Sequence, residues 1–166
     1  MIDQKRINEI ETRARKVIGD YLGDPSTISI PIDLATILER LKLNLYEVEF
    51  DDPTIAGAYN KAASAIYVSS SDQKARQFFS VAHELGHYFL NPRKSTEIFY
   101  RSQLNQFDSH FPADEQEANW FAASLLMPEE LVKKIWEEEK SEAILAAKFG
   151  VSASAAHWRL KNLNII

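Results

Sequence analysis

The sequence predicts an α+β domain that is mainly helical and contains a small sheet of about three antiparallel strands. Apolar residues recur at helical spacing before residue 42 and again after residue 72, whereas between residues 43 and 70 they alternate in strand fashion. This order of helices, small sheet and helices is typical of α+β domains. With 166 residues, of which 45% are hydrophobic, the chain is long enough to bury one core.

The predicted elements follow one another without an internal repeat or a Gly/Ser-rich linker, so we expect one domain over residues 1–166. Its parts are N-terminal helices over 1–42, the small sheet over 43–70, a long helix over 72–91, a second long helix over 113–127 and two short helices over 141–166. The polar residues 93–112 are expected to form a long loop with some local structure. Pro128 is expected to begin a further helix.

Two apolar stripes predict the N-terminal helices. The first stripe consists of Ile7, Ile10, Ala14, Val17, Ile18 and Tyr21, and the second of Leu34, Ile37, Leu38 and Leu41. Pro31 stands where the second helix begins, because its fixed φ angle suits the first turn of a helix.

Three short strands are predicted between residues 43 and 70. Tyr46, Val48 and Phe50 alternate with glutamates, and Ile55–Tyr59 and Ala65–Val68 supply the other two strands. Because the connections are short, we expect the strands to be antiparallel, with the sheet packed on the helix over 72–91.

Composition and charge exclude several classes of protein. The chain has no cysteine, which excludes a disulfide scaffold, a thiol nucleophile and a Cys-based zinc site. The formal net charge is −5, so no general attraction to nucleic acid or anionic lipid is expected. No stretch approaches the ~20 apolar residues of a membrane span, and the N-terminus lacks the apolar run of a secretory signal. We therefore expect a cytoplasmic protein that does not contact membranes.

One motif in the predicted helix over 72–91 carries chemistry. His83-Glu84-Leu85-Gly86-His87 has the pattern H-E-x-x-H. Histidines four residues apart lie about one turn apart on the same helix face, so both imidazoles can reach one ion. Zinc accepts imidazole nitrogen readily, and Glu84 is placed to take a proton from a metal-activated water as general base. The motif predicts a zinc-dependent peptidase with one zinc per chain.

The third metal ligand has to come from another segment. The candidates are Asp114, Glu115 and Glu117 in the predicted helix over 113–127, and His110 just before it. Glu115 and Glu117 are two residues apart and point to nearly opposite sides of that helix, so only one of them can face the metal. The spacing does not choose between them.

At these residues the sequence resembles the ImmA/IrrE-type metallo-endopeptidases. The matching stretches are PIDLATILERLKLNLYEV, ARQFFSVAHELGHYFLN, EQEANWFAASLLMP and AAKFGVSASAAHWRLKNLNII, in the order in which the family has them. The resemblance implies a single metallopeptidase domain of zincin-like fold, with Glu84 as catalytic base. It also implies that the glutamate of the E-A-N segment, Glu117, completes the metal site with His83 and His87.

The resemblance further implies a kind of substrate. Members of the family typically cleave a helix-turn-helix transcriptional repressor in the control of mobile elements or stress responses. We therefore expect a specific regulatory protein as substrate and partner, and no direct contact with nucleic acid.

The C-terminal helices leave an alternative open. Residues 146–160 have the spacing of a helix-turn-helix, with Arg159 and Lys161 as possible cations. The alternative is a non-enzymatic regulator that uses these helices to bind a protein or DNA. His157 and Tyr88 are weaker candidates for stabilising an oxyanion in the peptidase.

Overall fold

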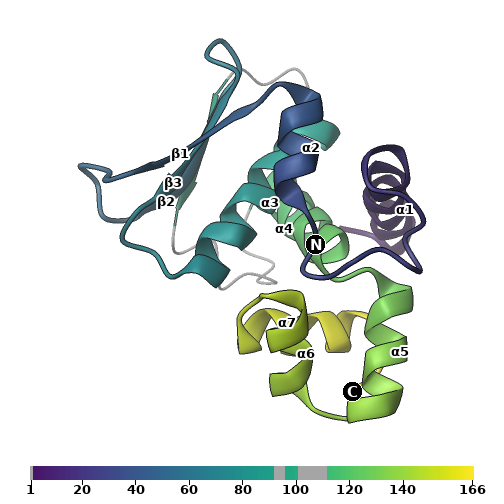
Figure 1. Cartoon of the computed structure of the whole chain (residues 1–166). Coiled ribbons are helices and arrows are strands. Elements are labelled where there is room, and N and C mark those ends of the chain that lie inside the picture. Colours follow the sequence, from purple (N-terminus) through teal and green to yellow (C-terminus); the bar gives the residue numbers. More distant parts are fainter. Residues whose placement is uncertain (1, 92–95, 101–111) are drawn as a thin grey trace.

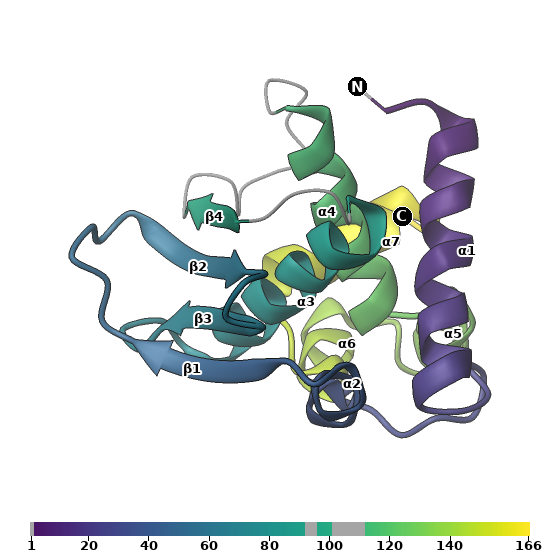
Figure 2. The same ribbon diagram turned by 90° about the horizontal axis from the view of Figure 1, so that it is seen from above.

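A central pair of helices separates the sheet from the N-terminal helix. In the computed structural model, which describes residues 2–91, 96–100 and 112–166, the sheet lies on one side of α3 (Lys74–Leu90) and α4 (Ala113–Leu126). The N-terminal helix α1 (Gln4–Tyr21) lies on the other side, as the view from above shows (Figures 1 and 2). The C-terminal helices α5 (Glu129–Glu139), α6 (Glu142–Phe149) and α7 (Ala153–Asn162) lie together beneath this arrangement (Figure 1).

The N-terminal helices form as their apolar stripes predict. In α1, the buried residues are Ile10, Ala14, Val17 and Ile18, and Asp3 caps the helix by accepting a hydrogen bond from the backbone N–H of Arg6 at 2.8 Å. The second helix, α2 (Leu34–Leu41), is capped in the same way by Asp33, which accepts from Thr36 N–H at 3.0 Å. Both predicted helices are confirmed, but the second begins at Leu34 and not at Pro31. Among the described residues, no helix is long and apolar enough to cross a membrane.

The sheet differs from the prediction in its pairing. Its described strands are β1 (Asn44–Val48), β2 (Ile55–Asn60), β3 (Ala65–Ser69) and β4 (Thr96–Tyr100), in the order β1-β3-β2-β4. Strand β2 is antiparallel to β3 and to β4, but β1 is parallel to β3. The expectation of an entirely antiparallel sheet of three strands is therefore wrong in detail, although the α+β class is confirmed.

The chain direction explains this correction. A short turn reverses the chain between β1 and β2, and a second turn reverses it again between β2 and β3. The turns therefore predict the direction of each strand correctly. They do not predict which strands pair, because β3 inserts between β1 and β2. Strand β4 lies in the segment 93–112, for which the sequence predicts a long loop with some local structure, and it extends the sheet beyond β2.

A buried ion pair joins the C-terminal helices to the rest of the molecule. Arg159 in α7 is fully buried, and its guanidinium donates to the carboxylate of Glu11 in α1, with Nη2 3.0 Å from Oε2. Its Nε donates to the backbone carbonyl of Met127 at the end of α4, at 2.9 Å. Burial raises the pKa of Glu11, but the hydrogen bonds and charge of Arg159 outweigh this effect and leave the pKa below its ordinary value. Arg159 is therefore a structural residue, and it is not available to contact DNA.

Replacing Arg159 is expected to destabilise the fold strongly. In Arg159→Met, Glu11 loses its charged partner, and the free energy of unfolding should fall by about 3 kcal/mol. Arg15→Met is the matched control, because it breaks the more exposed ion pair with Glu130 and should cost less than about 1 kcal/mol. Urea denaturation of both variants measures the difference, and equal losses would contradict a structural role for Arg159.

Candidate metal centre and active site

The two histidines of the motif lie side by side on the buried face of α3. Residues His83 and His87 are 0% and 2% exposed, and their ring centroids are 4.7 Å apart. Their Nε2 atoms are separated by 3.0 Å. The four-residue spacing therefore presents two imidazole nitrogens to one point, as the motif predicts.

A carboxylate from α4 completes the cluster. One oxygen of Glu115 lies 3.2 Å from His83 Nε2, and the other lies 3.3 Å from His87 Nε2. The candidate ligand atoms of the three residues all lie within 4.8 Å of one another. Glu115 is the second residue after the helix start at Ala113, so α4 reaches the histidines with its first turn.

This geometry corrects the prediction that Glu117 is the third ligand. The Glu117 carboxylate instead forms a two-pronged ion pair with Arg6 of α1, with distances of 2.9 Å and 2.6 Å. Because neighbouring positions on a helix differ by about 100°, residues 115 and 117 point about 200° apart, and only the former faces α3. Asp114 is not part of the cluster, and His110 lies outside the described residues.

A further residue of α4 orients one imidazole. Asn119 is 1% exposed, and its Oδ1 lies 2.8 Å from Nδ1 of His83. With this oxygen as acceptor, Nδ1 carries the proton and Nε2 keeps its lone pair toward the cluster. Asn119 follows Glu115 by four residues, so one face of α4 supplies both groups. Sequence reasoning missed Asn119, although this i, i+4 spacing was a signal that could have found it.

Burial and hydrogen bonding set the charge of the cluster. Burial lowers the pKa of His83, which favours the neutral imidazole. Burial alone would raise the pKa of Glu115, but its close polar contacts with the His83 and His87 imidazoles outweigh burial and hold this pKa well below its usual range. Neutral imidazole and ionised carboxylate are the forms that bind metal ions.

The donor set fits a divalent cation. Two imidazole nitrogens and one carboxylate are three protein ligands, the number found in catalytic zinc sites that keep a position for water. All three side chains are nearly buried, and a buried carboxylate is costly unless a cation or strong donors balance it. His83, His87 and Glu115 are therefore the residues that could hold a zinc ion.

The general-base candidate lies between α3 and the sheet. Glu84 is fully buried, and a Cβ atom added at Gly57 in β2 would lie 3.6 Å from its Oε1. The same added atom would lie 3.2 Å from the Tyr67 carbonyl, so the tight contact of a side chain at position 57 would be with β3. Gly57 therefore permits the close pairing of β2 with β3 where β2 passes Glu84.

The two oxyanion candidates have other neighbours. The ring of Tyr88 packs against Tyr59 and Phe89, with centroids 6.0 Å and 5.1 Å apart. His157 in α7 has Nδ1 3.1 Å from both carboxylate oxygens of Glu142. The structure does not bring His157 into the cluster of His83, His87 and Glu115.

The fold and the site define a class of protein: a helix-rich α+β domain with a buried His-His-Glu cluster on two adjoining helices. Residues 38–161 match the model of the Peptidase_M78 family, described as the IrrE N-terminal-like domain. The chain belongs to this family, and its membership supports a metallopeptidase role.

One protein is similar to this chain in sequence, and another is similar in structure. The chain is 35% identical over 106 residues to the uncharacterized immunity region protein 2 of Bacillus phage phi105, an alignment that covers 64% of this chain and 63% of the phage protein. A Mycobacterium tuberculosis transcriptional regulator has a similar structure, with a TM-score of 0.65 and 17% sequence identity. That similarity covers 94% of this chain but 48% of the regulator, so this chain spans about half of its length and the likeness shows the fold alone.

The contact between α3 and α4 gives the first test of the site. A Cβ atom added at Gly86 would lie 2.9 Å from Ala118 Cα and 3.0 Å from its carbonyl oxygen, so Gly86→Ala has to push α4 away from α3. We expect a loss of about 1–3 kcal/mol in the free energy of unfolding and weaker zinc binding. Gly19→Ala in α1, where nothing lies within 4 Å, should instead stabilise the protein by about 0.5–1 kcal/mol. Thermal unfolding and zinc titration of both variants measure the effect, and the same sign of stability change in both would contradict it.

The choice of third ligand gives the second test. Glu115→Ala should lower the zinc content of the purified protein from about one per chain to a small fraction, because a ligand of a three-ligand site is lost. Glu117→Ala removes only the partly exposed ion pair with Arg6, so it should keep its zinc and lose less than about 1 kcal/mol of stability. Elemental analysis after dialysis decides between them, and zinc loss in the second variant alone would restore Glu117 as the ligand.

Proposed function

We propose that this chain is a zinc-dependent endopeptidase that cleaves a specific regulatory protein inside the cell. The observation that carries the proposal is the convergence of His83, His87 and Glu115. Glu84, which is buried, follows His83 directly in the H-E-x-x-H motif. Membership of the Peptidase_M78 family supports the same reaction class.

The side chains have separate roles in this proposal. His83, His87 and Glu115 would hold a zinc ion, which would supply the Lewis acidity that activates a water molecule and a peptide carbonyl. Glu84 takes the proton of the attacking water on its carboxylate and passes it to the leaving amine. Asn119 is a positioning residue, because it fixes the ring orientation and the protonated nitrogen of His83.

The proposed substrate is a helix-turn-helix transcriptional repressor. The similarity to a protein named for a phage immunity region supports a role in regulation rather than in bulk proteolysis. Cleavage of a single accessible peptide bond would be enough to inactivate such a repressor.

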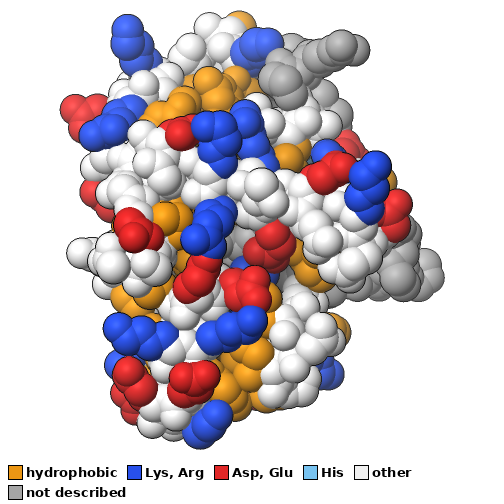
Figure 3. Space-filling model, turned by 90° about the vertical axis from the view of Figure 1, so that its right-hand side faces the viewer, with side chains coloured by type: hydrophobic (Ala, Val, Ile, Leu, Met, Phe, Trp, Pro, Cys, Tyr) orange, Lys and Arg blue, Asp and Glu red, His pale blue; other side chains and the backbone are white. Residues whose placement is uncertain are grey.

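No observation favours the alternative of a DNA-binding module. Of the two cations in α7, Arg159 is buried against Glu11, and the ammonium of Lys161 lies 5.3 Å from the ring centroid of Trp158. Basic and acidic side chains are interspersed over the face shown in Figure 3. A surface that binds DNA through phosphates needs clustered cations.

Co-expression with a candidate helix-turn-helix repressor, chosen from any that are encoded near this gene, tests the proposal. The native chain should convert the repressor into two defined fragments, identified by mass spectrometry. Glu84→Gln should slow this cleavage by about 10²–10⁴-fold, since only the proton transfer is lost, while the protein keeps about one zinc per chain. Unchanged cleavage by this variant, or fragments that also form in cells without the peptidase, would contradict the proposal.

A further inference from the structure

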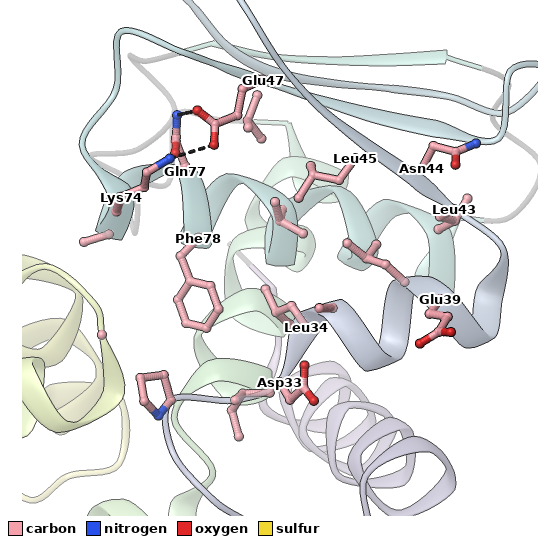
Figure 4. A pocket seen from close by; sticks show the side chains of 18 residues that line it. Asp33, Leu34, Glu39, Leu43, Asn44, Leu45, Glu47, Lys74, Gln77 and Phe78 are labelled. Atoms are coloured by element: carbon pink, nitrogen blue, oxygen red, sulfur yellow. Dashed lines mark hydrogen bonds and ion pairs between the residues drawn. The ribbon is translucent and has the colours of Figure 1, made fainter.

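A second concave site lies on the opposite face of α3 from the histidines. It is a pocket of about 730 Å³ between α2, β1 and α3 (Figure 4). Val81 lines it, and this residue is two positions from His83, so the two side chains point about 200° apart on the helix. A molecule in this pocket would leave the metal centre uncovered.

The pocket is apolar inside and open at its mouth. Its floor consists of the buried side chains of Leu34, Leu38, Leu43, Val68 and Val81. Phe78 lines one wall, and Leu45 extends from β1 over the cavity (Figure 4). Leu45 is 45% exposed, which leaves a large apolar side chain in water beside an apolar cavity. A pocket of this size and character is suited to receive apolar side chains.

The strand beside the pocket has an open edge. Among the described strands, β1 pairs only with β3 and therefore forms one edge of the sheet. The N–H of Asn44 donates to Ser64, and the carbonyl of Val48 accepts from Ser70, so these alternate residues direct their backbone groups toward the β3 side. By the alternation of a parallel ladder, the backbone groups of Leu45 and Glu47 point away from β3, where an added strand could bond to them.

The rim of the pocket is predominantly acidic. It carries the carboxylates of Asp33, Glu39 and Glu47 and one cation, Lys74, whose ammonium lies 2.6 Å from Glu47 (Figure 4). The rim therefore has an excess of negative charge. A segment that enters an apolar pocket through this rim is favoured if lysine or arginine flanks its apolar residues.

We propose that the pocket and the open edge of β1 together form a docking site for an extended segment of the substrate protein. The segment adds a strand to β1, places alternate apolar side chains in the pocket and sets flanking Lys or Arg residues against Glu39 and Glu47. Its identity as part of the substrate rests on the proposed function: a DNA-binding repressor carries the cations that the acidic rim attracts. Docking here would hold the substrate while the cleaved segment reaches the metal on the other face of α3.

A synthetic peptide tests the docking site without cleavage. The probe is fluorescein-labelled KTFTLTK-amide, in which Lys, Phe, Leu and Lys share one face of an extended strand. Its binding to zinc-loaded full-length Glu84→Gln protein is measured by fluorescence anisotropy. We expect saturable binding, binding at least about tenfold weaker for ETFTLTE-amide, and an affinity reduced about fivefold by Glu39→Lys.

Two modifications test the strand pairing. Leu45→Ala and Leu45→Pro both remove the side chain, but only proline removes the outward N–H, so binding should be weaker in the second variant than in the first. If Leu45→Pro does not fold, peptides N-methylated at every second residue replace it. Methylation in one phase should abolish binding, and methylation in the other phase should leave it nearly intact, because only alternate N–H groups of a strand face its neighbour.

Several results would overturn the docking site: equal binding of the basic and acidic peptides, equal effects of both methylation phases, or a concentration-dependent dimer that Leu45→Pro abolishes. The last result would assign the edge of β1 to a second copy of the chain. Peptide binding and repressor cleavage are measured separately, so the two proposals can fail independently. Binding without any cleavage counts against the proposed function, and cleavage without peptide binding counts against the docking site.

Discussion

The close approach of α3 and α4 is the constraint on which the candidate metal centre depends. Gly86 stands between the two histidines in sequence, and the space that a Cβ atom would need there is taken by the Cα and carbonyl of Ala118. Ala118 lies one turn beyond Glu115, so this contact sets the first turn of α4 against the face of α3 that carries His83 and His87. A third ligand from a distant segment can be held reliably only if the two backbones are fixed to each other in this way.

The surrounding contacts hold α4 from its other sides. Arg6 of α1 forms an ion pair with Glu117 of α4. Glu11 of α1 accepts hydrogen bonds from Trp120 and Ser124 of α4, so α1 contacts the side of α4 that faces away from α3. Arg159 joins the same glutamate to the end of α4 and brings α7 into the assembly. These polar groups, of which Arg159 is fully buried and the ion pairs are partly buried, are costly to desolvate, but they satisfy one another and favour one orientation of α4. The polar contacts on the α1 side of α4 thus hold the helix in the orientation that turns Glu115 toward the histidines of α3.

The two faces of helix α3 have different surroundings. One face carries the histidines and meets α4, while the opposite face lines the apolar pocket beneath the edge of β1. A rigid helix that presents chemistry on one face and a binding surface on the other keeps the two sites at a fixed relative position. Such an arrangement suits an enzyme that acts on one folded protein, because specificity then comes from contacts away from the cleaved bond.

The sequence by itself determined the features that depend on neighbours along the chain. The i, i+4 spacing put His83 and His87 on one face of a helix, and apolar residues at helical spacing predicted α1, α2, α3 and α4. Residues 146–160 had the spacing of a helix-turn-helix, and α6 and α7 lie there. The H-E-x-x-H motif predicted the zinc peptidase, the family resemblance added the class of substrate, and the family match over residues 38–161 includes this motif.

Only the tertiary structure decided which distant groups meet. Whether Glu115 or Glu117 reaches the histidines depends on the rotation of α4 about its own axis, and the contacts of Gly86 with Ala118 and of Arg6 with Glu117 set that rotation. The neighbours of β1 likewise depend on where β3 inserts, although the turns had fixed the direction of each strand. The physical reason is the same in both cases: periodicity along a chain fixes which face a residue occupies, whereas the packing of separate elements fixes what that face touches.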